Sequence, residues 1–123
     1  MIEKIGIGID IVDVKRFENI LYGMKPSFYK KIFLTSEIEY CLRHRNPYEH
    51  FAGKFAIKEA VKKSIKKDVS MLDIKTSHSN SRPTIEILNK KIGKFVFVVS
   101  LSHDKQIAIA VVISERIHES GRR

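Results

Sequence analysis

The segment from Tyr48 to about Lys66 has the strongest helical pattern in the chain. Its apolar side chains recur at three- and four-residue spacing, and lysines lie on the opposite side. The recurring positions are Phe51, Ala52, Phe55, Ala56, Ala60, Val61, Ser64 and Ile65. A helix with such an apolar stripe must bury it against another layer, so this segment constrains how the rest of the chain can pack.

The sequence on both sides of this helix has the period of two that is typical of strands. This alternation predicts strands over residues 2–12, 72–78, 83–88, 94–102 and 106–114. The last two strands form a hairpin, with its turn at His103-Asp104-Lys105. Strands at both ends of the chain around helices predict an α+β fold, in which an antiparallel sheet is wrapped around and packed on the long central helix.

Two shorter helices are expected between the first strand and the long helix. Asp13 can cap a helix whose apolar stripe runs over residues 14–21. Pro26 ends that helix or starts a short turn. Ser36 and Glu39 have the spacing of a capping box at the start of another helix.

The length of 123 residues predicts a single domain over 1–123. No stretch approaches the run of about 20 apolar residues that a membrane span needs. The single cysteine, Cys41, excludes an internal disulfide, and its apolar surroundings indicate a core residue. These features favour a cytoplasmic protein with no membrane partner. The polar residues 115–123 are expected to fray.

The net charge of the chain is +9. A field of this sign attracts polyanions, whether nucleic acid, nucleotide phosphates, acidic proteins or anionic lipid. A basic surface that is simply solvated explains the charge equally well. The net charge therefore indicates polyanions as the class of partners, but it does not distinguish among them.

Asp10 is predicted at the end of the first strand, after Gly6 and Gly8. Glycines in a strand allow another backbone or a ligand to approach closely. Asp10 alone is interpreted more readily as a capping or turn residue. The functional alternative is a ligand for Mg²⁺, which prefers one or two carboxylates plus substrate phosphates.

Glu59 lies on the long helix between Lys58 and the pair Lys62-Lys63. The ordinary interpretation is an exposed ion pair with Lys63, four residues later. A carboxylate surrounded by lysines near the buried edge of a helix also suits a site that holds a cation and phosphates together. His103, at the tip or the strand end of the last hairpin, is either incidental or a donor to a phosphate or carbonyl oxygen.

Four segments together resemble one family. The opening IGIGIDIVDVKRF, the helical FAGKFAIKEAV and the hairpin VVSLSHDKQIAIAVV resemble three motifs of the holo-acyl-carrier-protein synthases, the short, trimeric type of 4′-phosphopantetheinyl transferase. NSRPTI resembles a weaker fourth motif. In order and spacing, the four motifs span essentially the whole chain.

The resemblance implies an enzyme that moves 4′-phosphopantetheine from coenzyme A to a serine of apo-acyl carrier protein, in support of fatty acid biosynthesis. It implies a catalytic set of Asp10, Glu59 and His103, with Mg²⁺ held by Asp10, Glu59 and the pyrophosphate of coenzyme A. The serine attacks the β-phosphorus and 3′,5′-ADP leaves. The acceptor of the serine proton stays open between Glu59, Asp10 and a metal-bound water.

The resemblance also implies residues for the substrate and for partners. Lys54, Lys58, Lys62 and Lys63 would contact phosphates, whereas Asn80, Pro83, Ser102 and His103 would line the nucleotide side. Family members form homotrimers with active sites between subunits, so His103 is expected to serve the carboxylates of a neighbouring chain. Lys15 and Arg16 resemble the surface that docks the carrier, an acidic helical protein.

The chain departs from the family pattern at four places. Lys54 stands where many relatives have arginine. The point charge of an ammonium would therefore replace the bidentate phosphate contact of a guanidinium. The segment IKKDVS lacks the usual glycine, and Ser81 stands where glycine is common. LNKKIGK is a poor match to the alanine-rich helix that relatives have before the last hairpin.

The sequence leaves two other classes of function as alternatives. A basic nucleic-acid-binding module would explain the charge. The aromatic residues, however, lie mostly on apolar faces and no interleaved aromatic-basic strand is present, so we expect no nucleic-acid partner. Such a module would bind RNA or DNA with strong salt dependence and without Asp10 or Glu59. A silent domain of the same fold would bind coenzyme A or the carrier without turnover.

Overall fold

The structure is a computed structural model that describes residues 4–117. Its elements in chain order are β1 (Ile5–Asp13), α1 (Lys15–Glu18), α2 (Pro26–Lys30), α3 (Thr35–Leu42), α4 (Pro47–Ile65), β2 (Ile74–Ser79), β3 (Arg82–Ile87), β4 (Phe95–His103) and β5 (Ile107–Arg116). The 3₁₀ helices η1 (Met71–Asp73) and η2 (Lys90–Ile92) precede β2 and β4. The predicted fraying of 115–123 falls mostly outside the described residues, and β5 itself continues to Arg116.

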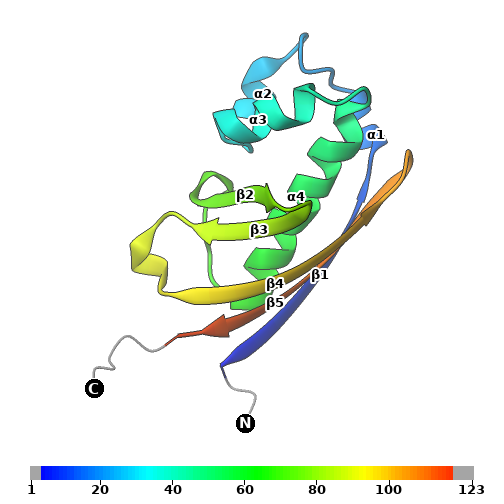
Figure 1. Ribbon diagram of the computed structural model, residues 1–123. Helices are drawn as coiled ribbons and strands as arrows, with labels where there is room; N and C mark the ends of the chain where they lie inside the picture. The colour runs from blue at the N-terminus through cyan, green and yellow to red at the C-terminus, as the bar shows by residue number, and fades with distance from the viewer. Residues whose placement is uncertain (1–3, 118–123) are drawn as a thin grey trace.

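The long helix α4 is the centre of the fold, as predicted. It packs along one face of a three-stranded antiparallel sheet with the order β1-β5-β4, while β2 and β3 form a separate antiparallel hairpin beside it (Figure 1). Helices α1, α2 and α3 gather around the N-terminal end of α4 (Figure 1). The α+β fold with antiparallel strands packed on a central helix is therefore confirmed.

Strand β1 packs against α4 through its glycines. A Cβ on Gly6 would be 1.7 Å from the carbonyl oxygen of Ser64, and a Cβ on Gly8 would be 2.0 Å from that of Ala60. Only glycine allows the strand and the helix to approach so closely. Because Gly6 meets Ser64 and Gly8 meets Ala60, β1 runs antiparallel to α4.

The isoleucines of β1 lie on the other side of the sheet. Ile7 and Ile11 are 66% and 62% exposed. They belong to an outer apolar face, made of residues Ile5, Ile7, Ile9, Ile11, Val96, Val98, Ile107 and Ile113. The alternation that predicted the strand is real, but the glycine side, rather than the isoleucine side, packs on the helix.

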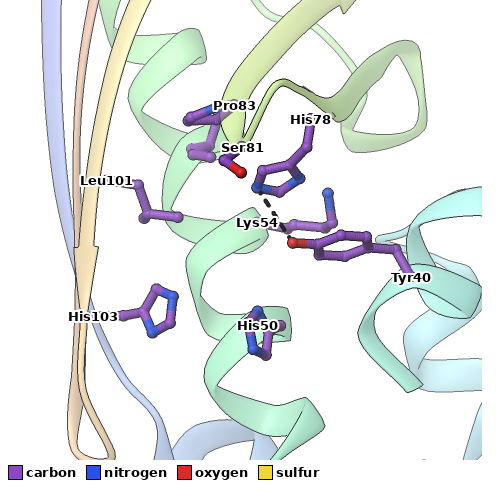
Figure 2. A pocket seen from close by; sticks show the side chains of 9 residues that line it. Tyr40, His50, Lys54, His78, Ser81, Pro83, Leu101 and His103 are labelled. Atoms are coloured by element: carbon purple, nitrogen blue, oxygen red, sulfur yellow. Dashed lines mark hydrogen bonds between the residues drawn. The ribbon is translucent and has the colours of Figure 1, made fainter. Parts of the chain in front are cut away.

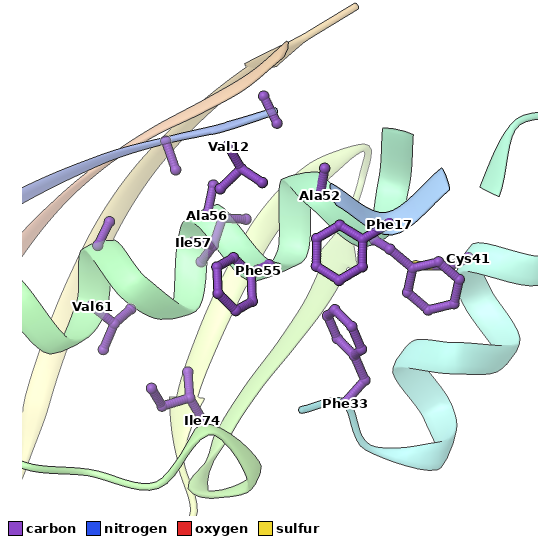
Figure 3. Close-up of a cluster of buried hydrophobic side chains, with 14 of the residues drawn as sticks. Val12, Phe17, Phe33, Cys41, Ala52, Phe55, Ala56, Ile57, Val61 and Ile74 are labelled. Carbon is purple, nitrogen blue, oxygen red and sulfur yellow. The ribbon is translucent and has the colours of Figure 1, made fainter. Parts of the chain in front are cut away.

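The core lies between α4 and the elements around it. Buried aromatic rings from α1, α2, α4 and the segment before α3 pack together, among them Phe17, Phe33 and Phe55 (Figure 3). The Tyr29 hydroxyl donates to the carbonyl oxygens of Phe17 and Ile20, and burial raises its pKa. Cys41 is fully buried and burial raises the pKa of its thiol to about 12, which confirms the interpretation of a core residue.

Several predicted boundaries need correction. Asp10 lies inside β1, paired with Ala110, because the strand continues through buried Val12 to Asp13. The helix after Asp13 is short and ends at Glu18, although Asp13 Oδ1 does accept the Lys15 N–H at 3.0 Å. The prediction of a capping box formed by Ser36 and Glu39 was wrong.

The residue that caps α3 is Glu37. Its Oε1 accepts the backbone N–H of Leu34 at 2.7 Å, so the observed pair, Leu34 and Glu37, lies two positions earlier than the predicted pair. Pro26 begins α2, because its fixed φ suits the first position of a helix.

The structure shows the local conformation at three of the departures from the family pattern. Lys66 ends α4 in the left-handed conformation (φ 57°) that glycine usually occupies at a helix C-terminus. Asn80 and Ser81 both have positive φ, as the two-residue turn between β2 and β3 requires. The segment LNKKIGK contains only the short η2 (Lys90–Ile92).

Candidate functional site

The two predicted carboxylates lie where β1 crosses α4. The Asp10 side chain is on the helix side of β1 and is 16% exposed. Lys63 Nζ donates to Asp10 Oδ1 at 3.1 Å and to the carbonyl oxygen of Ile9 at 3.0 Å. Glu59 lies one turn before Lys63, so both side chains project from the same side of α4 toward β1.

Glu59 does not pair with Lys63. The ordinary interpretation of Glu59 as half of that ion pair was therefore wrong, because the ammonium contacts Asp10 instead. Glu59 is half-buried, and no hydrogen bond or ion pair engages its carboxylate within residues 4–117. Lys62, also half-buried, lies beside it on the helix.

The fit of this site to Mg²⁺ depends on what completes the coordination. The part of the chain that the structure describes holds no group of three or more His, Cys, Asp or Glu arranged for a metal ion. Asp10 and Glu59 supply two carboxylates from adjacent elements. Magnesium commonly binds one or two carboxylates and takes its other ligands from water and substrate phosphates, so this donor set fits a metal that arrives with a phosphate ligand.

A second site is a cavity of about 450 Å³ on the other side of α4, which we name the histidine cavity. Figure 2 shows its side chains, contributed by α3, α4, the β2–β3 hairpin and β4. Its lining residues are Tyr40, His50, Lys54, Ile57, His78, Ser81, Pro83, Leu101 and His103. Three residues predicted for phosphate and nucleotide therefore meet here: Lys54, Pro83 and His103.

Two other residues predicted for the nucleotide side do not line this cavity. Asn80 is exposed at the β2–β3 turn, beside the lining residue Ser81. Ser102 is exposed and alternates with the inward-facing Leu101 and His103, so its side chain points to the opposite face of the sheet. The strand period explains this correction, because adjacent residues of a strand face opposite sides.

The four histidines of residues 4–117 all gather at this cavity. The rings of His44 and His50 stack at 3.7 Å between centroids, and His50 meets His103 at 5.1 Å. Tyr40 stacks on His78 at 4.6 Å, and its hydroxyl lies 3.5 Å from His78 Nε2 (Figure 2). No spacing in the sequence signals this cluster, because its members come from separate elements.

Burial and neighbouring charges make His50 a weak base. Burial is the largest cause that lowers its pKa to about 4, and positive charge on His44, His103 and His78 lowers it further, whereas Glu49 opposes the shift. Burial also lowers the pKa of His78. His50 and His78 therefore stay neutral at pH 7.

His103 stands at the end of β4, as one of the two predicted placements has it. Its Nδ1 lies 2.8 Å from Glu49 Oε1. Across the sheet it is in register with Ala108, which pairs with Val12 rather than Asp10. Within one chain, His103 is thus two strands away from β1 and does not meet the two carboxylates.

The lysines predicted to contact phosphates divide into two pairs. Lys62 and Lys63 lie at the carboxylate site. Lys54 is 3% exposed but borders the histidine cavity; its Nζ donates to Thr76 Oγ1 at 3.0 Å and lies 4.6 Å from the centre of the Tyr40 ring. Burial lowers the Lys54 pKa.

Lys58 has a structural role, so its assignment to phosphate is corrected. Its fully buried ammonium donates to Glu37 Oε1 at 2.7 Å, to the Ile32 carbonyl at 2.9 Å and to the Met71 carbonyl at 3.0 Å. An ammonium has three N–H donors, and all three are used. Glu37 Oε2 also accepts from the Thr76 backbone and hydroxyl at 2.7 and 2.8 Å, which joins α3, α4 and β2.

The two predicted docking residues are exposed at the start of α1. The Arg16 guanidinium lies 4.5 Å from the centre of the Phe55 ring, so a residue of α4 supports it. This stacking places a basic side chain at the side of α4 that faces α1.

Among the described helices, none has the length and apolar composition to cross a membrane.

Comparisons with known proteins agree on one family. A sequence profile of the 4′-phosphopantetheinyl transferase superfamily matches residues 6–112. A holo-[acyl-carrier-protein] synthase from Syntrophus aciditrophicus (strain SB) is 38% identical over 93% of this chain and 98% of its own length. A protein of the same name from Thermodesulfovibrio yellowstonii is 39% identical over 88% of this chain and 96% of its own.

A solved structure carries the same fold. The crystal structure of Helicobacter pylori holo-[acyl-carrier-protein] synthase in complex with coenzyme A superposes with a TM-score of 0.77 at 35% identity. The match covers 89% of this chain and 99% of that one. Because the profile and these relatives span nearly the whole chain, it belongs to the holo-[acyl-carrier-protein] synthase family of 4′-phosphopantetheinyl transferases.

Proposed function

We propose that this protein transfers 4′-phosphopantetheine from coenzyme A to a serine of an apo-acyl carrier protein, in support of fatty acid biosynthesis in the cytoplasm. The observation that carries the proposal is the carboxylate site: Asp10 and Glu59 lie on adjacent elements, with Lys62 and Lys63 beside them. Charges of both signs in one place suit a ligand that combines a cation with phosphates.

The proposed reaction is a phosphoryl-type transfer. The serine oxygen of the carrier forms a bond to the β-phosphorus of coenzyme A, and the bond from that phosphorus to the bridging oxygen breaks, so that 3′,5′-ADP leaves with the electron pair. The serine proton goes to a base. Glu59 is the best candidate, because Asp10 already accepts from Lys63 while no partner engages Glu59 within residues 4–117.

Asp10 and Glu59 would hold Mg²⁺ together with the pyrophosphate of coenzyme A. Magnesium bound there neutralises negative charge on the transferring group. Lys63 contributes a positive charge at the same place, since its side chain is 54% exposed and its ammonium contacts Asp10. The protein's contribution is mainly position and charge, as is usual for this type of transfer.

The histidine cavity is the proposed place for the adenosine end of coenzyme A. Pro83 and Leu101 offer apolar walls, while Lys54 and His103 offer donors to phosphate oxygens. Both donors point into a partly buried space, where a charged hydrogen bond is stronger than in water. The cavity and the carboxylate site lie on different sides of α4. One chain therefore does not bring the two sites together, and a complete active site needs a second chain.

We further propose that the working form is a homotrimer with its active sites between subunits. Within one chain the strand β5 separates His103 from β1, so we infer that the cavity of a neighbouring chain faces the Asp10–Glu59 site of this chain. The outer apolar face supports the assembly, because contiguous exposed apolar surface of this kind is typical of an interface. The acidic carrier would dock on Lys15 and Arg16; Arg16 stacks on Phe55, which lies one helical turn before Glu59 on α4.

The test is the initial rate of 3′,5′-ADP release from coenzyme A with apo carrier and increasing Mg²⁺. Asp10→Asn and Glu59→Gln should each lower the rate at saturating coenzyme A on the order of 100-fold, because each removes charge that holds the metal and the phosphates. Asp68→Asn, at an exposed carboxylate away from the site, is the control. Wild-type rates in both site variants would exclude the metal assignment; coenzyme A binding without any release would favour a silent domain.

A further inference from the structure

The Glu49 carboxylate is held by side chains at both of its oxygens. Oε1 accepts from His103 Nδ1 at 2.8 Å, and Oε2 accepts from the Asn46 amide at 2.9 Å. The His103 and Glu49 side chains are 25% and 17% exposed. Two successive hydrogen bonds thus connect Asn46, at the start of α4, through Glu49 to His103, at the end of β4, and His103 lines the cavity.

Helix capping does not explain this arrangement. Glu49 is in the first turn of α4, where an acidic residue commonly accepts a backbone N–H. Here its printed partners are two side chains, and Asn46 makes no side-chain capping bond either. Asn46 is bonded to Glu49 instead, and Glu49 is bonded to His103.

The hydrogen bond determines which ring nitrogen of His103 remains for a ligand. A carboxylate can only accept, so Nδ1 must carry a proton. Nε2 then has no hydrogen-bond partner within residues 4–117, while the ring lines the histidine cavity. To donate to an anionic oxygen, Nε2 must also be protonated, and the negative charge of Glu49 balances the resulting imidazolium.

We propose that Glu49 is a positioning residue for substrate binding: supported by Asn46, it orients His103 so that Nε2 donates to a phosphate of the adenosine portion of coenzyme A. Glu49 itself does not touch the substrate. The inference rests on the proposed function, because it takes the histidine cavity as the site of that phosphate. It assigns a role to two residues that no sequence motif identified.

Binding of adenosine 3′,5′-bisphosphate, measured by titration calorimetry, tests the proposal without requiring turnover. Glu49→Ala should weaken binding about tenfold, the effect of losing one charge-assisted hydrogen bond. Glu49→Gln keeps an acceptor for Nδ1 but removes the charge, so it should fall between wild type and Glu49→Ala. Glu86→Gln, at an exposed glutamate outside the cavity, is the matched control and should bind like wild type.

A double-mutant cycle separates positioning from a general structural effect. In a His103→Gln background, Glu49→Ala should cause no further loss, since the residue it positions is gone. In turnover assays, Glu49→Ala should raise the KM for coenzyme A while kcat stays within about twofold of wild type.

The same tenfold loss in both backgrounds, or unchanged binding in Glu49→Ala, would overturn the proposal. If the alanine variant does not fold, the near-isosteric Glu49→Gln keeps the test decisive. A Glu49→Gln protein with the affinity and the KM of the wild type would exclude a role for the charge of Glu49. Failure of the wild-type protein itself to bind the nucleotide would instead count against the proposed function.

Discussion

Gly8 of β1 lies against the carbonyl oxygen of Ala60 in α4, so that a Cβ on Gly8 would stand 2.0 Å from that oxygen. Asp10 follows two residues later on the same side of the strand, and Glu59 precedes Ala60 on the helix. The glycine contact therefore determines how closely the strand that carries Asp10 approaches the helix that carries Glu59.

Gly8→Ala should destabilise the protein by about 3 kcal/mol or more, because strand and helix must separate to admit the methyl group. Urea denaturation followed by circular dichroism measures the effect. Gly23→Ala is the matched control, since nothing lies within 4 Å of its added Cβ, and it should change stability by less than about 0.5 kcal/mol. Equal stability of the two variants would contradict the close packing of β1 on α4.

Lys58→Met should cost about 3–5 kcal/mol of unfolding free energy, because it leaves the Glu37 carboxylate buried without its cation. Adding Glu37→Gln to Lys58→Met should recover part of the loss, since the uncompensated charge disappears. Lys62→Met, at a half-buried lysine of the same helix, is the control and should be nearly neutral. If Lys58→Met kept full stability but lost coenzyme A binding, Lys58 would be a substrate residue after all.

The pH dependence of stability should include a contribution from His50. Its pKa is about 4 in the folded protein and 6.5 in an unperturbed chain, so between these values the unfolded state binds a proton that the folded state does not. Stability should therefore fall as the pH falls from 6.5 toward 4. In His50→Phe the urea midpoint should depend less on pH across this window, whereas parallel curves for the two proteins would exclude the contribution.

Val98→Lys should convert the proposed trimer to a monomer. Ile7, Ile113 and Val98 form one row across the outer apolar face, and an ammonium in that row cannot be buried unpaired in an interface. Sedimentation equilibrium of the wild type should give three times the monomer mass, and that of the variant one. Thr84→Lys, on exposed β3, should stay trimeric. A monomeric wild type at micromolar concentration would contradict the assembly.

The sequence was sufficient to predict the main elements of the fold. The helical spacing from Phe51 to Ile65 matches α4, and the predicted strands match β1 to β5 to within a few residues. These succeed because periodicity reports which side of an element is buried. The periodicity of β1 was harder to interpret, because glycine has no side chain: Gly6 and Gly8 mark the packed side, while the isoleucines beside them face outward.

The site was only partly predictable. Asp10 and Glu59 are proposed from family motifs. The ion pair of Lys63 with Asp10, however, joins residues far apart in the sequence, and helical spacing alone predicted the wrong partner for Lys63. Lys58 was misassigned because nothing local shows that Glu37 receives its ammonium. The side chains of the histidine cavity come from elements far apart in the sequence, so only the folded chain reveals it.

The most direct test of the central claim is the intact mass of an apo-acyl carrier protein after incubation with this protein, coenzyme A and Mg²⁺. We expect an increase by one 4′-phosphopantetheine group. The increase should be lost when the acceptor serine of the carrier is replaced by alanine, and when the Asp10→Asn variant is used in place of the wild-type enzyme. An unchanged carrier mass with the wild-type protein and a carrier known to accept the group would contradict it.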